Sequence, residues 1–159
     1  MVNKKGRPVS REYIELTQLI ERLHRRFLDV LRTELKRIGV RELNGVQALL
    51  LSNIGDEEIL IRDLIERGYY QGSNVSYNIK KLTDFGYLEQ ERAEHDKRTV
   101  AIRLTDKAKT VVDRVKELEA ENSKAFQDAL GGAETLTDAC ETLGKLERIW
   151  DDYIRYGGR

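Results

Sequence analysis

Apolar residues recur every three or four positions along most of this chain, and the spacing changes to near-alternation only between residues 87 and 104. The first spacing is typical of amphipathic helices, whereas alternation is typical of half-buried strands. The 159 residues fit one domain. On folding, a domain of this length buries about 70% of the surface that its unfolded chain exposes, so it needs neither a disulfide nor a metal for stability. The sequence therefore predicts a mainly α-helical fold with a small β-ribbon.

Glycines and capping residues divide the pattern into elements. We expect helices over 11–38, 44–54, 63–68, 73–85, 106–130 and 133–156, and strands over 87–92 and 99–104 joined by a charged loop, 93–98. Asn44, Asp63, Ser73 and Thr105 are the predicted N-caps, because their side chains accept hydrogen bonds from the first free amides of a helix. Ile59 and Ile61 are expected to pair with the ribbon. Within the ribbon, Leu88, Val100, Ile102 and Leu104 are the residues expected to face inward.

The charge is balanced in total but not along the chain. There are 28 Lys and Arg and 28 Asp and Glu, which ordinarily argues against a polyanionic partner. Residues 1–41, however, hold 11 basic and 5 acidic groups, whereas 106–159 hold 9 and 12. A local positive field near the N-terminal part is therefore compatible with binding an anionic polymer.

The residue types needed for catalysis are scarce. His24, His95 and Cys140 are the only histidines and cysteine, and no catalytic triad, metal-ligand spacing or glycine-rich phosphate loop occurs. We therefore expect no enzymatic activity, no cofactor and no metal. Cys140 lies among apolar residues and is expected to be a buried, inert thiol.

The longest unbroken apolar run, 48–51, is too short to span a membrane, and residues 1–8 are polar and basic without the apolar core of a signal peptide. The sequence therefore favours a cytoplasmic protein.

The predicted helix 73–85 has two different faces. Val75, Ile79 and Leu82 fall on one side and are assigned to the core. The other side, with the cap Ser73, carries hydrogen-bond donors that suit base edges and phosphates: Asn74, Ser76, Tyr77, Lys80 and Lys81. A solvated helix face has a similar composition, so the helix alone does not decide between the two readings.

The run Asp96–Lys107 resembles the signature of the multiple-antibiotic-resistance (MarR-type) regulator family, with D-x-R at a wing tip, an apolar strand and a helix that starts at L-T-x-K. Residues 73–88 are similar to that family's recognition helix, although Ala108 replaces the family's usual glycine and the loop 68–72 is unusual. Residues 69–78 are also similar to a bacterial subgroup that regulates L,D-transpeptidase genes. The resemblance implies one MarR-like domain over 1–159, with a winged helix-turn-helix lobe at 44–104 and a helical dimerisation lobe at 11–38 and 106–156.

The wing tip is the second predicted DNA contact. Arg98 can enter a narrow minor groove, and the resemblance implies that Asp96 holds its guanidinium in a bidentate pair. Arg92 and Lys97 complete the predicted set, although a charged hairpin tip also promotes solubility. The segment Lys4–Pro8 is compatible with a minor-groove arm or with an ordinary basic tail.

The two ends of the chain predict a homodimer, because their apolar stripes are broader than one chain can cover. The predicted interface residues are Leu16, Leu19, Leu23, Leu143, Ile149, Trp150 and Tyr153. Two recognition helices related by a two-fold axis match near-palindromic duplexes with half-sites about 34 Å apart.

The resemblance also implies control by a small molecule, often aromatic or phenolic, which releases the DNA. The candidate lining residues are His24, Phe27, Tyr69 and Tyr70, although residues of these types more often belong to the ordinary core. The function predicted from the sequence is that of a transcriptional regulator that represses, or less often activates, nearby genes. The alternative is a winged-helix module that binds protein and not DNA.

Overall fold

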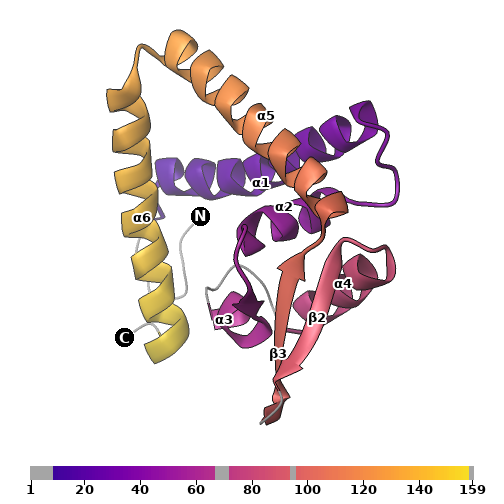
Figure 1. Ribbon diagram of the computed structural model, residues 1–159. Coiled ribbons are helices and arrows are strands. Elements are labelled where there is room, and N and C mark those ends of the chain that lie inside the picture. The colour runs from indigo at the N-terminus through magenta and orange to yellow at the C-terminus, as the bar shows by residue number, and fades with distance from the viewer. Residues whose placement is uncertain (1–8, 67–71, 94–95, 158–159) are drawn as a thin grey trace. The chain divides into compact units, whose positions relative to one another are not determined.

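The computed structural model describes residues 9–66, 72–93 and 96–157, and the side chains of Ser73, Ala93, 96–99 and Leu130 lie outside that description. The described chain is mainly helical with one three-stranded antiparallel sheet (Figure 1). It forms two compact units that divide between Lys116 and Glu117, inside helix α5 (Asp106–Leu130). The predicted class, mainly α with a small ribbon, is confirmed.

Helix α1 (Arg11–Arg37) begins at Ser10, whose hydroxyl oxygen accepts a hydrogen bond from the Tyr13 amide at 3.3 Å. It ends one residue earlier than predicted, with Ile38 as the C-cap. Gly39 then takes a φ of 81°, a left-handed conformation that costs glycine little because it has no Cβ. The glycine therefore ends the helix, as the sequence predicts.

Helix α2 (Gly45–Ile54) has the predicted N-cap. Asn44 Oδ1 accepts from the Gln47 amide at 2.9 Å, and Gln47 Oε1 accepts from the Asn44 amide at 3.0 Å, which completes a capping box. A Cβ on Gly45 would lie 2.6 Å from the Leu28 carbonyl oxygen of α1. The start of α2 can approach α1 this closely only because residue 45 is glycine.

The next elements are strand β1 (Ile59–Leu60) and helices α3 (Ile61–Glu66) and α4 (Gly72–Asp84). Three sequence predictions are wrong here. Ile61 begins α3 instead of pairing with the ribbon, so Asp63 lies in the first turn of α3 and does not cap it. Ser73 lies inside α4, because that helix already starts at Gly72. Ser and Asp are favoured both as caps and in the first turn, so their presence does not fix the first residue.

The central strand of the sheet is β3 (Asp96–Leu104), which pairs with β1 on one side and with β2 (Leu88–Ala93) on the other. Ile59 pairs with Ile102 as predicted, and Leu88 pairs with Leu104. The predicted loop 93–98 is too long, because Ala93 belongs to β2 and β3 already begins at Asp96. A ribbon with charged residues on both faces lacks the alternation that reveals a strand in the sequence.

The core of the first unit combines side chains from α1, α2, α4, the sheet and the first turns of α5. Leu88 and Ile102 are buried as predicted, whereas Val100 and Leu104 are half-buried. Other fully buried members are Leu31, Leu50, Leu51, Leu64, Val75, Leu82, Val111 and Val112. Thr105 caps α5 as predicted, since its hydroxyl oxygen accepts from the Ala108 amide at 3.3 Å. Because they share this core, α4 and the sheet are held in fixed positions relative to each other.

The second unit contains the rest of α5 and helix α6 (Ala133–Tyr156), with Gly131 and Gly132 between them at φ values of 79° and 118°. The bounds of α6 agree with the predicted ones. No residue of α6 is buried, and Cys140 is exposed, so its predicted burial is wrong. The apolar stripe around Cys140 is real, but its own unit does not cover it.

Candidate nucleic-acid interface

Helix α4 has one face that packs in the core and other faces that carry the predicted DNA contacts. Val75, Ile79 and Leu82 are at most 2% exposed and anchor the helix in the core, as predicted. On other sides of the helix, Asn74, Ser76, Tyr77 and Lys80 are exposed and Lys81 is half-buried. The Lys81 ammonium lies 5.8 Å from the centroid of the Tyr77 ring, within range of a cation–π contact. Apart from Ser73, whose side chain is not described, the predicted α4 contacts therefore offer amide, hydroxyl and ammonium groups outside the core.

Asn78 is a buried polar residue of α4 whose contacts were not predicted from the sequence. Its side chain is buried, and its Oδ1 accepts from Gln47 Nε2 of α2 at 3.3 Å. The side-chain Nδ2 of Asn78 donates to the backbone carbonyl oxygen of Asn74 at 2.9 Å. The capping box of α2 is thus hydrogen-bonded to the first half of α4. The N-x-x-Q spacing at Asn44 was a usable signal for the box, whereas the contact with Asn78 depends on the fold.

The wing is formed by β2 and β3. Arg92 is exposed opposite Val100, where the pairing becomes irregular, and Arg103 pairs with Glu89 across the strands at 2.7 Å. Asp96, Lys97 and Arg98 lie on β3 and not in the predicted loop, and their side chains are outside the described part. The pairing of Asp96 with Arg98 therefore stays a prediction.

A polar cluster fixes the base of the wing. The Tyr87 hydroxyl donates to Glu42 Oε1 at 2.6 Å, and Lys107 Nζ lies 3.5 Å from the same oxygen and 4.2 Å from the centroid of the Tyr87 ring. Lys107 also donates to the Phe85 carbonyl oxygen at 2.8 Å. We call Glu42, Tyr87 and Lys107 the wing-base cluster. It joins the loop after α1 to the start of β2 and to the start of α5.

The Tyr87 hydroxyl is the main reason that the pKa of Glu42 is lowered to about 2, while burial raises the pKa of Tyr87. A carboxylate with a lowered pKa stabilises the fold above its unfolded pKa, and this contribution is lost as the pH falls through the folded pKa. We expect Glu42→Gln to lower the free energy of unfolding by about 1 kcal/mol at pH 7, since the side chain is partly exposed. In urea titrations, the gap between variant and wild type should close between about pH 5 and pH 2. A gap that stays constant with pH would contradict the assignment.

The comparisons with known proteins agree with this geometry. Residues 43–108 match the family described as the winged helix DNA-binding domain. Streptococcus pneumoniae FabT, crystallised in complex with DNA, superposes with a TM-score of 0.72 at 17% identity, covering 88% of this chain and 98% of FabT. Sco3205, a MarR family transcriptional regulator from Streptomyces coelicolor also crystallised with DNA, gives 0.70 at 19% identity, covering 94% and 92%. These two structures establish the shared fold.

A closer relative by sequence is the exopolysaccharide II synthesis transcriptional activator ExpG of Rhizobium meliloti (strain 1021). It is 35% identical over 145 residues, which cover 91% of this chain and 75% of the relative. The chain belongs to the MarR family of winged-helix transcriptional regulators. The narrower resemblance to the L,D-transpeptidase subgroup of the MarR family stays a prediction.

Each unit of this MarR-family chain carries an apolar helix face that its own residues leave open. On α1, Leu19 and Leu23 are 40% and 54% exposed, and Leu16 is half-buried. On α6, the predicted interface residues are also exposed: Leu143, Ile149, Trp150 and Tyr153. Soluble proteins rarely leave contiguous apolar faces open to water, so these faces fit the predicted dimer interface.

The structure describes two of the four predicted ligand residues, His24 and Phe27. His24 and Phe27 are exposed on α1, so Phe27 is not the core residue that the alternative reading expected. Tyr69 and Tyr70 lie outside the described residues. Neither His24 nor Phe27 lines the hollow beside the end of α1 or the hollow over the wing.

Within the described ranges, no three His, Cys, Asp or Glu side chains lie close enough to hold a metal ion. None of the helices described here is both long and apolar enough to cross a membrane.

Proposed function

We propose that this MarR-family protein binds near-palindromic double-stranded DNA as a homodimer and controls nearby genes, more often as a repressor than as an activator. The carrying observation is α4, whose buried face fixes it in the core while its exposed side chains offer donors and cations. Such a helix can enter a major groove, with the neighbouring wing reaching an adjacent minor groove.

The open apolar faces of α1 and α6 support the homodimer. An obligate dimer interface commonly buries more than about 2,000 Å² and resembles a divided core, which exposed leucines, a tryptophan and tyrosines can provide. A two-fold dimer presents two copies of α4 and therefore reads a sequence that is repeated with the same symmetry. Release of the DNA by a small aromatic or phenolic effector is also part of the proposal.

Selection of bound duplexes from a random pool at near-physiological salt tests the function directly. Enrichment of a two-fold-symmetric motif with half-sites about one helical turn apart is the expected result. A folded protein that enriches no motif would favour a winged-helix module that binds another protein.

Arg98→Ala tests the wing. Because an arginine in the minor groove contributes both charge and fit, the variant is expected to lose about 1–3 kcal/mol of affinity for the selected duplex. Its dimerisation should be unchanged, which sedimentation can verify. Arg103→Ala is the matched control, since Arg103 lies on the same strand as Arg98 and pairs with Glu89 of the neighbouring strand β2. Equal duplex affinity of wild type and Arg98→Ala would remove the wing tip from the mechanism.

A further inference from the structure

A hollow of about 450 Å³ lies where α1 ends and α2 begins, and all its charged lining residues are basic. Arg32 and Lys36 come from the last turns of α1, and Arg41 comes from the connecting loop. We call these three residues the corner cations. Val40, Leu43 and Asn44 complete the lining.

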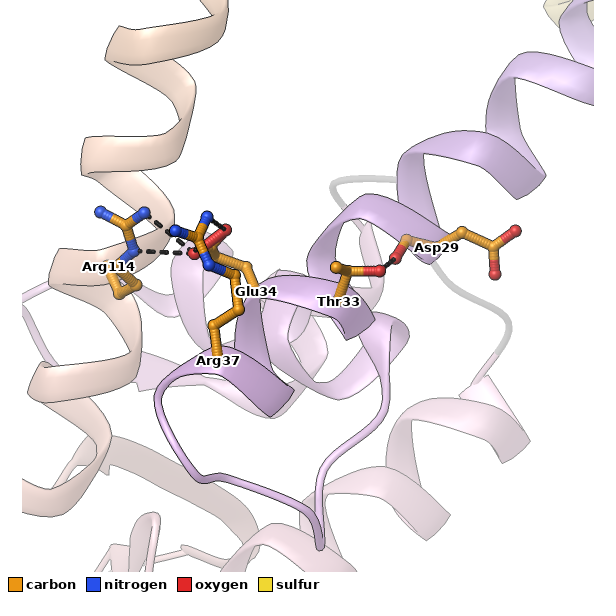
Figure 2. Close-up of polar contacts among 5 residues, drawn as sticks. All are labelled: Asp29, Thr33, Glu34, Arg37 and Arg114. Carbon is orange, nitrogen blue, oxygen red and sulfur yellow. Dashed lines mark hydrogen bonds and ion pairs between the residues drawn. The ribbon is translucent and has the colours of Figure 1, made fainter.

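The positive charge of this hollow is not cancelled by its neighbours. Lys36 and Arg41 are exposed, and neither side chain forms an ion pair with another described residue. The nearby acids are engaged elsewhere: Glu34 accepts from Arg114, as Figure 2 shows, and Glu42 belongs to the wing-base cluster. Two cations therefore remain available for an external anion.

The third corner cation, Arg32, lies 3.1 Å from Asp29, but both side chains are about half exposed. An exposed pair of this kind is weak and exchanges readily with another anion.

Hydrogen bonds connect the edge of the hollow to α4. Asn44 lines the hollow and shares the capping box with Gln47. Gln47 donates to Asn78 of α4, and Asn78 donates to the Asn74 carbonyl oxygen. When α4 occupies a major groove, the phosphates that border this groove run past the flanks of the helix.

We propose that Lys36 and Arg41, assisted by Arg32, bind phosphates of the DNA strand that borders the groove occupied by α4. The inference rests on the DNA binding proposed above and adds a backbone contact outside α4 and the wing. The N-terminus of α2 contributes a partial positive charge on the same side. Phosphate contacts position a protein without reading bases, so the corner cations set affinity and salt dependence and leave the preferred sequence unchanged.

The double variant Lys36→Gln/Arg41→Gln tests this on the selected duplex over a range of salt concentrations. Each lost phosphate contact reduces the slope of log Kd against log salt by about 0.9, so two contacts in each of two protomers reduce it by about 3.6. A change of 3.6 in this slope corresponds to a roughly 4,000-fold change in affinity between 1 M and 0.1 M salt, so we expect the affinity near 0.1 M salt to fall on the order of 1,000-fold. The ratio of affinities for selected and unrelated duplexes should stay within about twofold, because both duplexes carry the same phosphates.

Lys145→Gln/Arg155→Gln is the matched control, because it removes the same charge from exposed positions of α6. It should shift the slope by less than about one, the value expected for a single phosphate contact. Circular dichroism checks the fold of each variant. Lys36→Gln alone, which changes one exposed side chain, provides a milder test with half the expected change in slope.

Three results would overturn the proposal, and they are distinguishable. If wild type and the double variant bind the selected duplex with equal slopes, the corner does not contact DNA although the proposed function holds. If inorganic phosphate raises the unfolding temperature of wild type but not of the variant, and duplex binding is equal, the corner is a small-anion site. If wild-type protein binds no duplex at all, the proposed function fails together with this inference.

Discussion

Ile149→Asp is expected to convert the protein from a dimer into a monomer and to abolish tight duplex binding. Ile149 is 63% exposed on α6, and no α6 residue is buried within its own unit. In a dimer that covers this stripe, each new carboxylate would be buried without a partner, which costs about 3–5 kcal/mol per protomer, or roughly 150- to 5,000-fold in the dimer dissociation constant for each carboxylate. Duplex binding should fall with it, because a monomer loses the joint binding of two half-sites. Sedimentation equilibrium and duplex titration measure the two effects.

The control for this experiment is Arg148→Asp. At 3.6 residues per turn, residue 148 lies about 100° from Ile149, on the side away from Leu143, Trp150 and Tyr153. It introduces a larger change in charge on the same helix, yet we expect the dimer to persist. If Ile149→Asp also remains dimeric, the dimer interface does not include this stripe of α6.

The helix bounds could be predicted where a periodic apolar stripe ends at glycine. Helix α6 agrees at both ends because Gly132 and Gly157 flank it, and α1 differs by one residue at Ile38. The errors at Asp63 and Ser73 arose where cap and first-turn preferences overlap, so residue type did not fix the start. The length of β3 was missed because the sequence of its charged end, residues 96–99, does not alternate between apolar and polar residues.

Part of the candidate site could also be predicted from the sequence, whereas the rest depends on the fold. Periodicity was enough to separate Val75 and Ile79 from the exposed residues of α4, because burial there follows one helix. The contact between Gln47 and Asn78 joins residues 31 positions apart, and no local pattern predicts such a pair. The corner cations were visible only as excess positive charge before residue 42. Their common hollow depends on how α1 meets α2, and therefore on Gly45.

Arg114→Met is expected to lower the free energy of unfolding by about 3 kcal/mol, because it leaves a buried carboxylate with too few partners. Glu34 of α1 is buried, and its Oε1 accepts from Arg114 Nη2 of α5 at 2.9 Å and from Arg114 Nε at 3.2 Å. Figure 2 shows that Arg114 and Arg37 both contact this carboxylate. Urea unfolding at pH 7 and fixed protein concentration measures the loss.

The hydrogen bond from Arg114 is the main cause that lowers the pKa of Glu34. The stabilisation is therefore present above the unfolded pKa and is lost on acidification, so the deficit of Arg114→Met should shrink below about pH 4.5.

Two further variants test whether the loss of stability in Arg114→Met comes from the broken buried ion pair or from the loss of a positive charge as such. Arg37→Met removes the other partner of Glu34, at 3.2 Å, but the Arg37 side chain is 68% exposed, so we expect a loss of less than about 1 kcal/mol. Glu34→Leu/Arg114→Met removes both charges of the buried pair and should recover most of the lost stability, because apolar residues of similar volume often replace such pairs at little cost. A double variant as unstable as the sum of the two single variants would show that the two side chains are not coupled. Recovery would establish that the link between α1 and α5 depends on charge matching, and that its loss is costly mainly when one charge is left alone.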